Sequence, residues 1–217
     1  MQPEDIRIDR KNDIMKRKLQ FALKRIMDFI LSFIGIIVLS PLFLIISVWI
    51  KLDSKGPVIF KQTRVGKNEE NFIIYKFRTM VVNAEKKKTL NIKAENIANF
   101  IFQDKKDNRI TKSGAFLRKT SLDEIPQLVN VLIGNMSLVG PRPEIPDVVK
   151  VYPEAYRQRL FVTPGITGLA QISGRGEIEL SKTVYYDLMY IKKFSLWLDI
   201  KIFFKTFLSV FKREGAY

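Results

Sequence analysis

The stretch FILSFIGIIVLSPLFLIISVWI, residues 29–50, decides the fold of this chain of 217 residues. It carries no charged residue, and at about 1.5 Å per residue a helix of that length crosses a hydrocarbon core of roughly 30 Å. The run is too long for the apolar region of a signal peptide, and no small-residue cleavage site follows it. The sequence therefore predicts a helix seated in a membrane.

A proline interrupts this run near its midpoint. Pro41 cannot donate the backbone hydrogen bond of a helix interior and its ring crowds the preceding turn, so a sharp bend is expected at Ser40-Pro41. The hydroxyl of Ser40 is the candidate to satisfy a backbone group that the bend frees. Asp28 is costly at depth, and we expect it to pair with Lys24 or Arg25 near the interface.

Basic residues stand on both sides of the run: Lys16, Arg17, Lys18, Lys24 and Arg25 before it, and Lys51, Lys55, Lys61, Arg64 and Lys67 after it. The positive-inside rule places such flanks on the cytoplasmic side, and a straight span can satisfy it for only one of them. We therefore favour a re-entrant helix-break-helix hairpin that enters the membrane and returns. A kinked single span is the alternative.

Two further regions have a clear pattern. Val58 to Gln62 and Phe72 to Phe77 are β-prone runs separated by a polar turn, which predicts a short hairpin with Lys76 and Arg78 on one face; a solvated face is the plain interpretation of that pair. Lys182 to Arg213 has a helical pattern that mixes aromatic residues with lysines, as in interfacial amphipathic helices, although a core helix is the alternative.

The densest set of chemical groups lies in SLDEIPQLVNVLIGNMSLVGPRPE, residues 121–144. Its apolar residues recur at helical spacing up to Gly134 and Asn135, so Asp123 and Glu124 stand at a helix N-terminus. One interpretation is capping, because Pro126 fits the third position of a helix capped by Asp123. The other is phosphate chemistry, because Arg142 follows in a rigid Gly-Pro-Arg-Pro turn and offers a fork suited to phosphate.

Composition narrows the chemistry. The chain has no His and no Cys, which excludes imidazole catalysis, thiol nucleophiles, Ser-His-Asp triads and ordinary zinc sites. Carboxylate, Lys, Arg, Tyr and hydroxyl groups remain, and a metal would be a hard ion such as Mg²⁺. The net charge of +15 indicates an acidic partner, and nucleic acid, anionic lipid and nucleotide-linked substrates all qualify.

Several motifs together resemble one known family, the bacterial sugar transferases, and specifically the small monotopic phosphoglycosyl transferases that move a phosphosugar from a nucleotide diphosphate sugar to a polyprenyl phosphate. The resemblance runs from about Lys24 to Arg213. Besides the broken apolar segment, the motifs are Gln62-Thr-Arg-Val-Gly, Tyr75-Lys-Phe-Arg-Thr-Met80, Asp107-Asn-Arg-Ile-Thr, Leu122-Asp-Glu-Ile-Pro-Gln-Leu, Met136-Ser-Leu-Val-Gly-Pro-Arg-Pro-Glu144, Pro164-Gly-Ile-Thr-Gly, Ser173-Gly-Arg175 and Tyr185-Tyr-Asp187.

The resemblance implies a ping-pong reaction in which Asp123 attacks the sugar-linked phosphate of a UDP-sugar, gives a covalent phosphosugar-enzyme and releases UMP. Glu124, with Asp123, would hold Mg²⁺. The implied phosphate and nucleotide-sugar contacts are Lys76, Arg118, Arg142, Arg175 and Asp187. One departure is Asn135, where the family usually has Asp, and we expect a turn role that Asn can fill. The resemblance is to a minimal catalytic core, and we expect no counterpart of the extra N-terminal membrane bundle of larger relatives.

These interpretations define the expected organisation. The fold class is α+β: a mostly helical, membrane-seated single domain with an N-terminal re-entrant helix-break-helix hairpin, a small β-hairpin and interfacial amphipathic helices. We expect a flexible arm at residues 1–14, the basic entry and kinked membrane helix at residues 15–55, and a catalytic domain on the cytosolic face at residues 56–217.

The expected partners are a UDP-sugar, polyprenyl (undecaprenyl) phosphate, membrane lipid and downstream glycosyltransferases, with no nucleic acid, at the cytoplasmic face of the bacterial inner membrane. Two alternatives have a different chemistry. A basic nucleic-acid-binding membrane protein would explain the charge, but the chain has no known binding motif and its aromatic residues do not alternate as a stacking platform. A non-catalytic membrane scaffold would use Asp123 only as a helix cap.

Overall fold

The computed structural model describes residues 2–84, 96–100, 108–174 and 178–211. Its helices are α1 (Lys18–Asp53), α2 (Lys112–Lys119), α3 (Gln127–Ile133), α4 (Pro146–Val149), α5 (Glu154–Arg157), α6 (Leu169–Gly174), α7 (Leu180–Lys192) and α8 (Leu196–Phe211). Strands β1 (Ile59–Val65) and β2 (Asn71–Phe77) form one sheet, and β3 (Ser137–Val139) and β4 (Gly165–Thr167) form another. The predicted α+β class with a small β-hairpin is confirmed.

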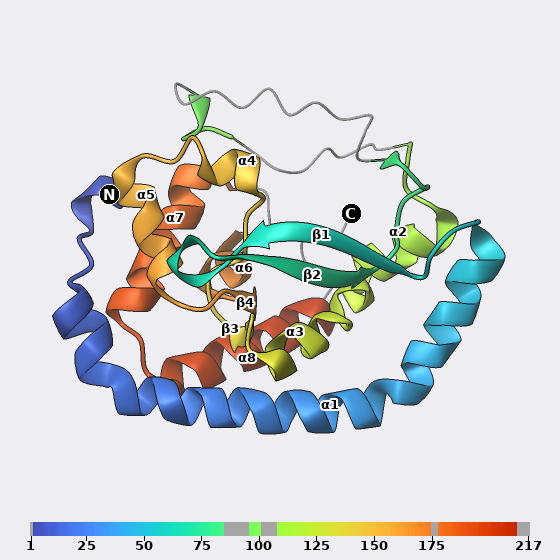
Figure 1. The fold of residues 1–217 in the computed structure, drawn as a ribbon, viewed down its shortest axis with the longest axis horizontal. Coiled ribbons are helices and arrows are strands. Elements are labelled where there is room, and N and C mark those ends of the chain that lie inside the picture. Colours follow the sequence, from blue (N-terminus) through green and yellow to red (C-terminus); the bar gives the residue numbers. More distant parts are fainter. Residues whose placement is uncertain (1, 85–95, 101–107, 175–177, 212–217) are drawn as a thin grey trace.

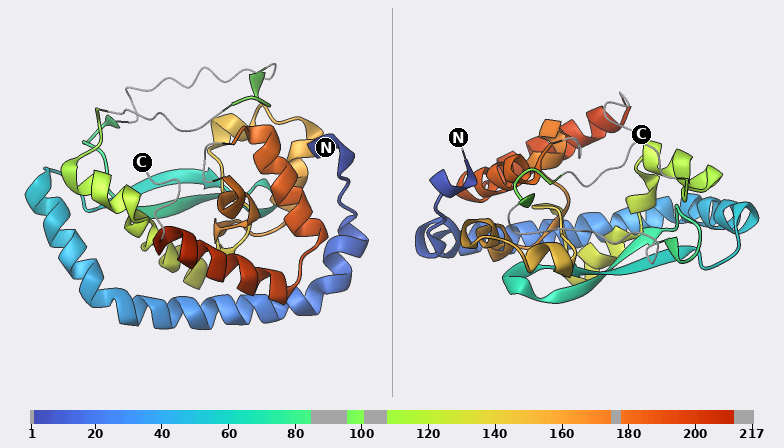
Figure 2. Two further views of the ribbon diagram at one scale, coloured as in Figure 1. Left: turned by 180° about the vertical axis from the view of Figure 1, so that it is seen from behind. Right: turned by 90° about the horizontal axis from the view of Figure 1, so that it is seen from above.

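Helix α1 frames the molecule: it runs along one edge and turns upward towards its C-terminal end (Figure 1). Seen from above, the β1–β2 hairpin lies on one face of the molecule and α7 and α8 lie on the other (Figure 2). In the β-hairpin the antiparallel register pairs Ile59 with Phe77 and Val65 with Asn71. The predicted hairpin is therefore confirmed, with both strands slightly displaced from their expected bounds.

The expected break in α1 is a bend inside one continuous helix, which does not fold back on itself. The Ser40 hydroxyl donates to the carbonyl of Ile37 at 2.8 Å. That carbonyl is the one an amide at position 41 would reach in an α-helix, and Pro41 has no amide hydrogen to offer. The Ser40 side chain thus supplies the missing donor, as predicted, and the helix continues through the proline.

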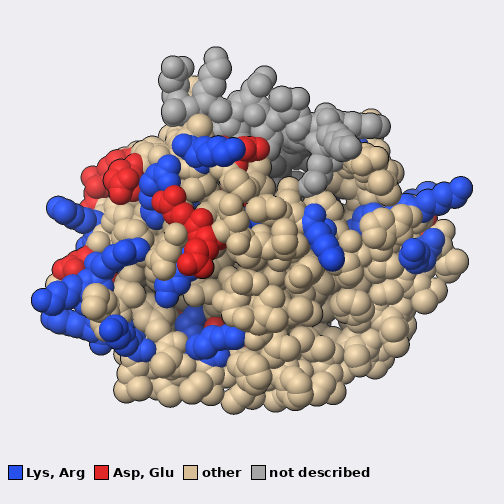
Figure 3. All heavy atoms as spheres, viewed as in Figure 1, with Lys and Arg blue, Asp and Glu red and all other residues tan. Residues whose placement is uncertain are grey.

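The two sides of α1 differ in polarity. Lys24, Asp28 and Ser32, at successive i, i+4 positions, are buried against the rest of the chain, and Lys24 pairs with Asp28 at 3.8 Å, which confirms the predicted pairing. The outer side exposes large apolar residues throughout its length, among them Phe29, Phe33, Ile37, Val38, Leu44, Ile45 and Val48. In the view of Figure 3 the margin formed by α1 is largely uncharged. By length and composition α1 could cross a membrane, and only 11% of its most apolar 18-residue window is buried.

The N-terminal segment differs from the flexible arm expected at residues 1–14. Ile6 and Ile8 are 4% and 6% exposed and belong to the main hydrophobic core. The amide of Ile8 donates to the side chain of Gln158. The preceding turn, Pro3–Asp5, contacts α5 and α7, and Ile6 and Ile8 bury apolar area in the same core, which holds the segment in place.

The C-terminal region contains one helix of each kind that the sequence allowed, a core helix and an amphipathic helix. Helix α7 is a core helix, with Leu180, Val184, Leu188 and Ile191 fully buried. Helix α8 is amphipathic and exposes Trp197, Phe203, Phe204, Phe207 and Leu208.

Strands β3 and β4 run parallel and fix the turn that follows β3. The amide of Gly140 donates to the carbonyl of Thr167 at 2.8 Å, and the amide of Gly165 donates to that of Pro141 at 2.9 Å. A Cβ atom on Gly165 would lie 2.1 Å from the nitrogen of Gly140. The two backbones therefore pack directly on each other, which only glycine allows.

Candidate active site

The acidic pair lies in a short 3-10 helix, η7 (Leu122–Glu124), ahead of α3. Ser121, which precedes it, has a left-handed backbone conformation with φ of 56°. Helix α3 begins only after Pro126, and neither helix has a side-chain cap hydrogen bond. The capping interpretation of Asp123 is therefore wrong for this structure. The predicted end of α3 is confirmed, because Gly134 takes φ of 99° directly after Ile133.

Glu124 is held between two cations from distant parts of the sequence. Its Oε1 atom accepts a hydrogen bond from Lys76 Nζ on β2 at 2.9 Å and another from Arg142 Nη2, in the turn after β3, at 2.9 Å. The side chains of Lys76 and Glu124 are 14% and 18% exposed, whereas that of Arg142 is 40% exposed. The structure thus brings together four of the predicted site residues, because Asp123 adjoins Glu124.

The two carboxyl groups have opposite pKa shifts. Burial raises the pKa of Asp123 to about 6, against the opposing attraction of Lys76 and with the repulsion of Glu124 adding to it. Burial also acts on Glu124, but Arg142 and Lys76 outweigh it and hold its pKa well below the usual range. Neighbouring carboxyl groups whose environments separate their pKa values are typical of sites that give the two groups different roles.

Arg118 approaches the site from α2. Its Nε atom donates to the Thr79 hydroxyl at 2.9 Å, and its charge also favours the ionised form of Asp123. The N-terminal part of α2 packs tightly on the chain that leaves β2: a Cβ atom on Gly114 would lie 2.1 Å from the carbonyl oxygen of Thr79. This contact fixes the side of α2 that carries Arg118.

Asp187 occupies a different environment from the one predicted. It is 1% exposed, and its Oδ2 atom lies 2.6 Å from Nη2 of the fully buried Arg159. Burial raises the pKa of Asp187 to about 6, with Arg159 opposing that shift. Arg159 also donates to Glu144, to the Tyr152 hydroxyl and to the carbonyl of Arg142 at 2.9 Å. Asp187 therefore contacts Arg159, and Arg159 in turn supports the backbone of the turn that carries Arg142.

The remaining predicted positions lie elsewhere. Arg175 falls outside the described residues, and Ser40 and Pro41 form the bend of α1. Asn135 is exposed just beyond α3, at the end opposite the acidic pair, which agrees with a turn role. The interpretation of Lys76 and Arg78 as a solvated face is wrong, because Lys76 bonds Glu124 and the buried Arg78 donates to the carbonyls of Ser54 and Lys55, which holds the end of α1.

Sequence reasoning missed Arg159, Glu144 and Thr79. Glu144 and Thr79 stand inside motifs that were recognised, but nothing in their spacing distinguished them from their neighbours. Arg159 lies in a short helical segment, η8 (Gln158–Phe161), that contains no motif. The only signal was an arginine beside apolar residues.

The acidic pair supplies oxygen donors of the kind that a hard metal ion prefers. Among the described residues no three acidic side chains gather, so a site built wholly from protein carboxylates is not formed there. Mg²⁺, however, is commonly held by one or two carboxylates together with substrate phosphates. Lys76 and Arg142 both bond Oε1 of Glu124, so the donor set of Asp123 and Glu124 suits such a shared site.

Comparison with known proteins identifies the family. The chain is 43% identical over 212 residues to an undecaprenyl-phosphate galactose phosphotransferase of Salmonella typhimurium, covering 95% of this chain and 44% of that protein. It is 43% identical over 203 residues to a UDP-glucose:undecaprenyl-phosphate glucose-1-phosphate transferase of Escherichia coli, covering 90% and 41%. An uncharacterized sugar transferase of Haemophilus influenzae is 47% identical over 199 residues, covering 90% and 42%. The chain thus spans less than half the length of these relatives. Residues 19–213 match the model of the family described as Bacterial sugar transferase, and the chain belongs to that family.

Proposed function

We propose that this chain transfers a phosphosugar from a UDP-sugar to undecaprenyl phosphate, with release of UMP, at a membrane surface. The observation that carries the proposal is the site in which Asp123 and Glu124 lie beside Lys76 and Arg142, next to a long apolar helix. The names of the Salmonella typhimurium and Escherichia coli relatives describe sugar phosphate transfer to this lipid and support the same chemistry here.

Asp123 serves as the nucleophile in this proposal. A carboxylate oxygen of Asp123 attacks the sugar-linked phosphorus of the UDP-sugar, a new phosphorus–oxygen bond forms, and the bond to UMP breaks with its electron pair leaving on UMP. An oxygen of undecaprenyl phosphate then attacks the same phosphorus. That step breaks the bond to Asp123, regenerates its carboxylate and gives an undecaprenyl diphosphate sugar.

The pKa values suit this division of roles. A nucleophile with a raised pKa is more basic than an ordinary aspartate, yet with a pKa of about 6 Asp123 is still mostly ionised at neutral pH. Glu124 stays ionised and anchors Lys76 and Arg142, whose charges neutralise the phosphoryl group. Arg118 adds a further positive charge from α2, and Arg175 is proposed as another phosphate contact.

Asp123 and Glu124 would hold Mg²⁺ together with the diphosphate of the substrate. A bound Mg²⁺ would supply neutralisation of phosphate charge at the leaving group. Asp187 would act indirectly, because its contact with Arg159 helps to position the backbone that carries Arg142.

The proposed membrane location is supported by α1. We infer that α1 enters the bilayer with its outer apolar side and that the site faces the cytoplasm at the bacterial inner membrane, where both basic flanks satisfy the positive-inside rule. The reaction would be the first membrane step of surface glycan assembly, and the enzymes that use its product would be downstream glycosyltransferases.

The test measures UMP release by purified chain in nanodiscs that contain undecaprenyl phosphate, with Mg²⁺ and each of a panel of UDP-sugars. Turnover of one or a few sugars is expected, with loss in Asp123→Asn and after chelation. Asp147→Asn is the matched control, because Asp147 is an exposed aspartate on α4. UMP release that persists in folded Asp123→Asn would show that Asp123 is not the nucleophile. No UMP release with any sugar would favour the non-catalytic scaffold.

A further inference from the structure

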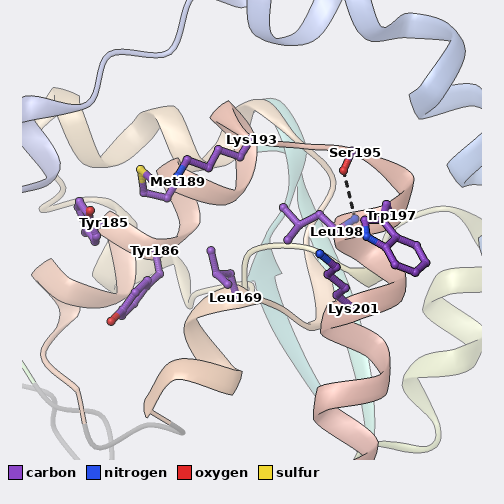
Figure 4. A pocket seen from close by; sticks show the side chains of 9 residues that line it. All are labelled: Leu169, Tyr185, Tyr186, Met189, Lys193, Ser195, Trp197, Leu198 and Lys201. Carbon is purple, nitrogen blue, oxygen red and sulfur yellow. Dashed lines mark hydrogen bonds between the residues drawn. The ribbon is translucent and has the colours of Figure 1, made fainter.

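A second site lies away from the acidic pair, where α6, α7 and α8 meet. The cavity has a volume of about 350 Å³, at the lower end of the range of roughly 300–1,000 Å³ for small-ligand pockets. Its wall is mostly apolar and aromatic, formed by Leu169 of α6, Tyr185, Tyr186 and Met189 of α7, and Trp197 and Leu198 of α8 (Figure 4). None of these residues belongs to the candidate active site.

Two lysines complete the lining of this cavity. Lys193 follows the last turn of α7 and lies beside Met189, whereas Lys201 comes from α8 and points into the space between the helices (Figure 4). The Nζ atom of Lys201 lies 5.4 Å from the ring centroid of Trp197. Within the described part of the chain neither lysine forms an ion pair with a carboxylate.

The nearest acidic residue in sequence is already engaged. Asp199 is buried, pairs with Lys24 of α1 and accepts a hydrogen bond from the Tyr190 hydroxyl at 2.8 Å. It therefore anchors the start of α8 to α1. Lys193 and Lys201 are both exposed, so their charges are open to an anion from outside the chain.

The surroundings of the pocket indicate where that anion comes from. Trp197 lines the pocket and is also 62% exposed. The exposed apolar face of α8 continues from it through Phe203, Phe204 and Phe207. An apolar helix face with tryptophan and lysine at its end is typical of the bilayer interface, where lysine meets lipid phosphate.

We propose that this pocket binds an anionic membrane phospholipid, with one acyl chain against the apolar wall and the phosphate between Lys193 and Lys201. Charge complementarity and the continuity with the α8 face select this occupant. The inference does not depend on the proposed reaction, since the pocket shares no residue with the acidic site.

Fluorescence quenching of Trp197 tests the proposal directly. The chain has two tryptophans, and Trp49→Phe leaves Trp197 as the only one while keeping the ring contact with Phe116. The Trp49→Phe chain is placed in phosphatidylcholine nanodiscs that contain a minor fraction of phosphatidylglycerol with brominated acyl chains. The comparison uses the same fraction of brominated phosphatidylcholine. Phosphatidylglycerol is expected to be enriched at Trp197 about fivefold for each lysine that contacts its phosphate.

Two double variants distinguish a specific lipid site from the general attraction of anionic lipid to a basic surface. Lys193→Gln with Lys201→Gln removes two charges at the pocket and should abolish the preference for phosphatidylglycerol. Lys192→Gln with Lys205→Gln removes two charges from neighbouring lysines that are also exposed but do not line the pocket, and should retain it. Equal loss in both double variants, or equal quenching by the two lipids in the parent, would overturn the proposal.

Competition distinguishes the source of the phosphate. Unlabelled phosphatidylglycerol should relieve quenching by its brominated form, whereas inorganic phosphate should not. Relief by inorganic phosphate would mean a simple anion site. Relief by undecaprenyl phosphate at amounts at which phosphatidylglycerol has no effect would assign the pocket to the acceptor lipid, and either result would refute the phospholipid site. Because this readout does not require turnover, it stands or falls separately from the transferase proposal.

Discussion

Replacing Lys76 by glutamine should move the pH range in which the chain is active. Lys76 donates to Glu124 at 2.9 Å, and its charge also lowers the pKa of the adjacent Asp123, which burial raises to about 6. The proposed nucleophile is the ionised form of Asp123. Activity is therefore expected above pH 6 and lost as the pH falls through that value, because protonation removes the attacking lone pair.

The size of the shift follows from the removed charge. An opposite charge within about 4–6 Å lowers a carboxyl pKa by roughly 1–3 units. Taking the lower limit, Lys76→Gln raises the pKa of Asp123 from about 6 to about 7, and the ionised fraction at pH 7 falls from about nine-tenths to about one-half. The acidic limb of the rate profile should thus move up by about one unit, in addition to any loss of substrate binding.

The assay measures steady-state initial rates of UMP release from a UDP-sugar between pH 5 and 9, and the pH dependence of kcat/KM reports groups of the free enzyme. The matched control is Lys61→Gln, because Lys61 lies on the same hairpin but is exposed over the ring of Tyr75. A profile that only decreases in height, with its acidic limb unmoved, would refute the assignment of that limb to Asp123.

Two further predictions concern stability. Arg159→Met leaves the buried Asp187 and Glu144 without their partner and should lower the free energy of unfolding by about 3–5 kcal/mol, whereas Arg157→Met, which removes a partly exposed pair with Glu69, should cost no more than about 1 kcal/mol. Denaturant titration of both variants measures this, and equal losses would contradict the buried network. Ser40→Ala removes the donor to Ile37 and should cost about 1 kcal/mol, but little in a Pro41→Ala background, where the restored backbone amide reaches the same carbonyl. A double-mutant cycle by thermal denaturation in detergent tests this, and additive effects would disprove that the Ser40 hydroxyl replaces the backbone amide that Pro41 lacks.

The elements that sequence predicted well are those determined by local pattern. The uncharged run with its proline, the alternation of β1 and β2, and the glycine that ends α3 all follow from spacing and backbone preference. The Ser40 donor and the Lys24–Asp28 pair were also predictable, because both join residues one turn apart or less. By contrast, the packing of Ile6 and Ile8 depends on α5 and α7, which lie far along the chain, so a polar segment was mistaken for a flexible arm.

The candidate site was only partly predictable for the same reason. Motif resemblance named Lys76, Asp123, Glu124 and Arg142, yet it could not say that Lys76 and Arg142 meet on one oxygen of Glu124. It also assigned Asp187 to the substrate, because an acidic residue in a motif gives no sign of its partner. That partner, Arg159, stands 28 residues earlier in a segment without any motif.

The backbone contact between Gly140 and Gly165 has a consequence for protein engineering. At this contact the turn that presents Arg142 rests directly on another backbone segment, so repacking of side chains cannot replace it; any Cβ atom at position 165 would separate the two loops. A mutant library intended to change sugar preference should therefore leave both glycines untouched.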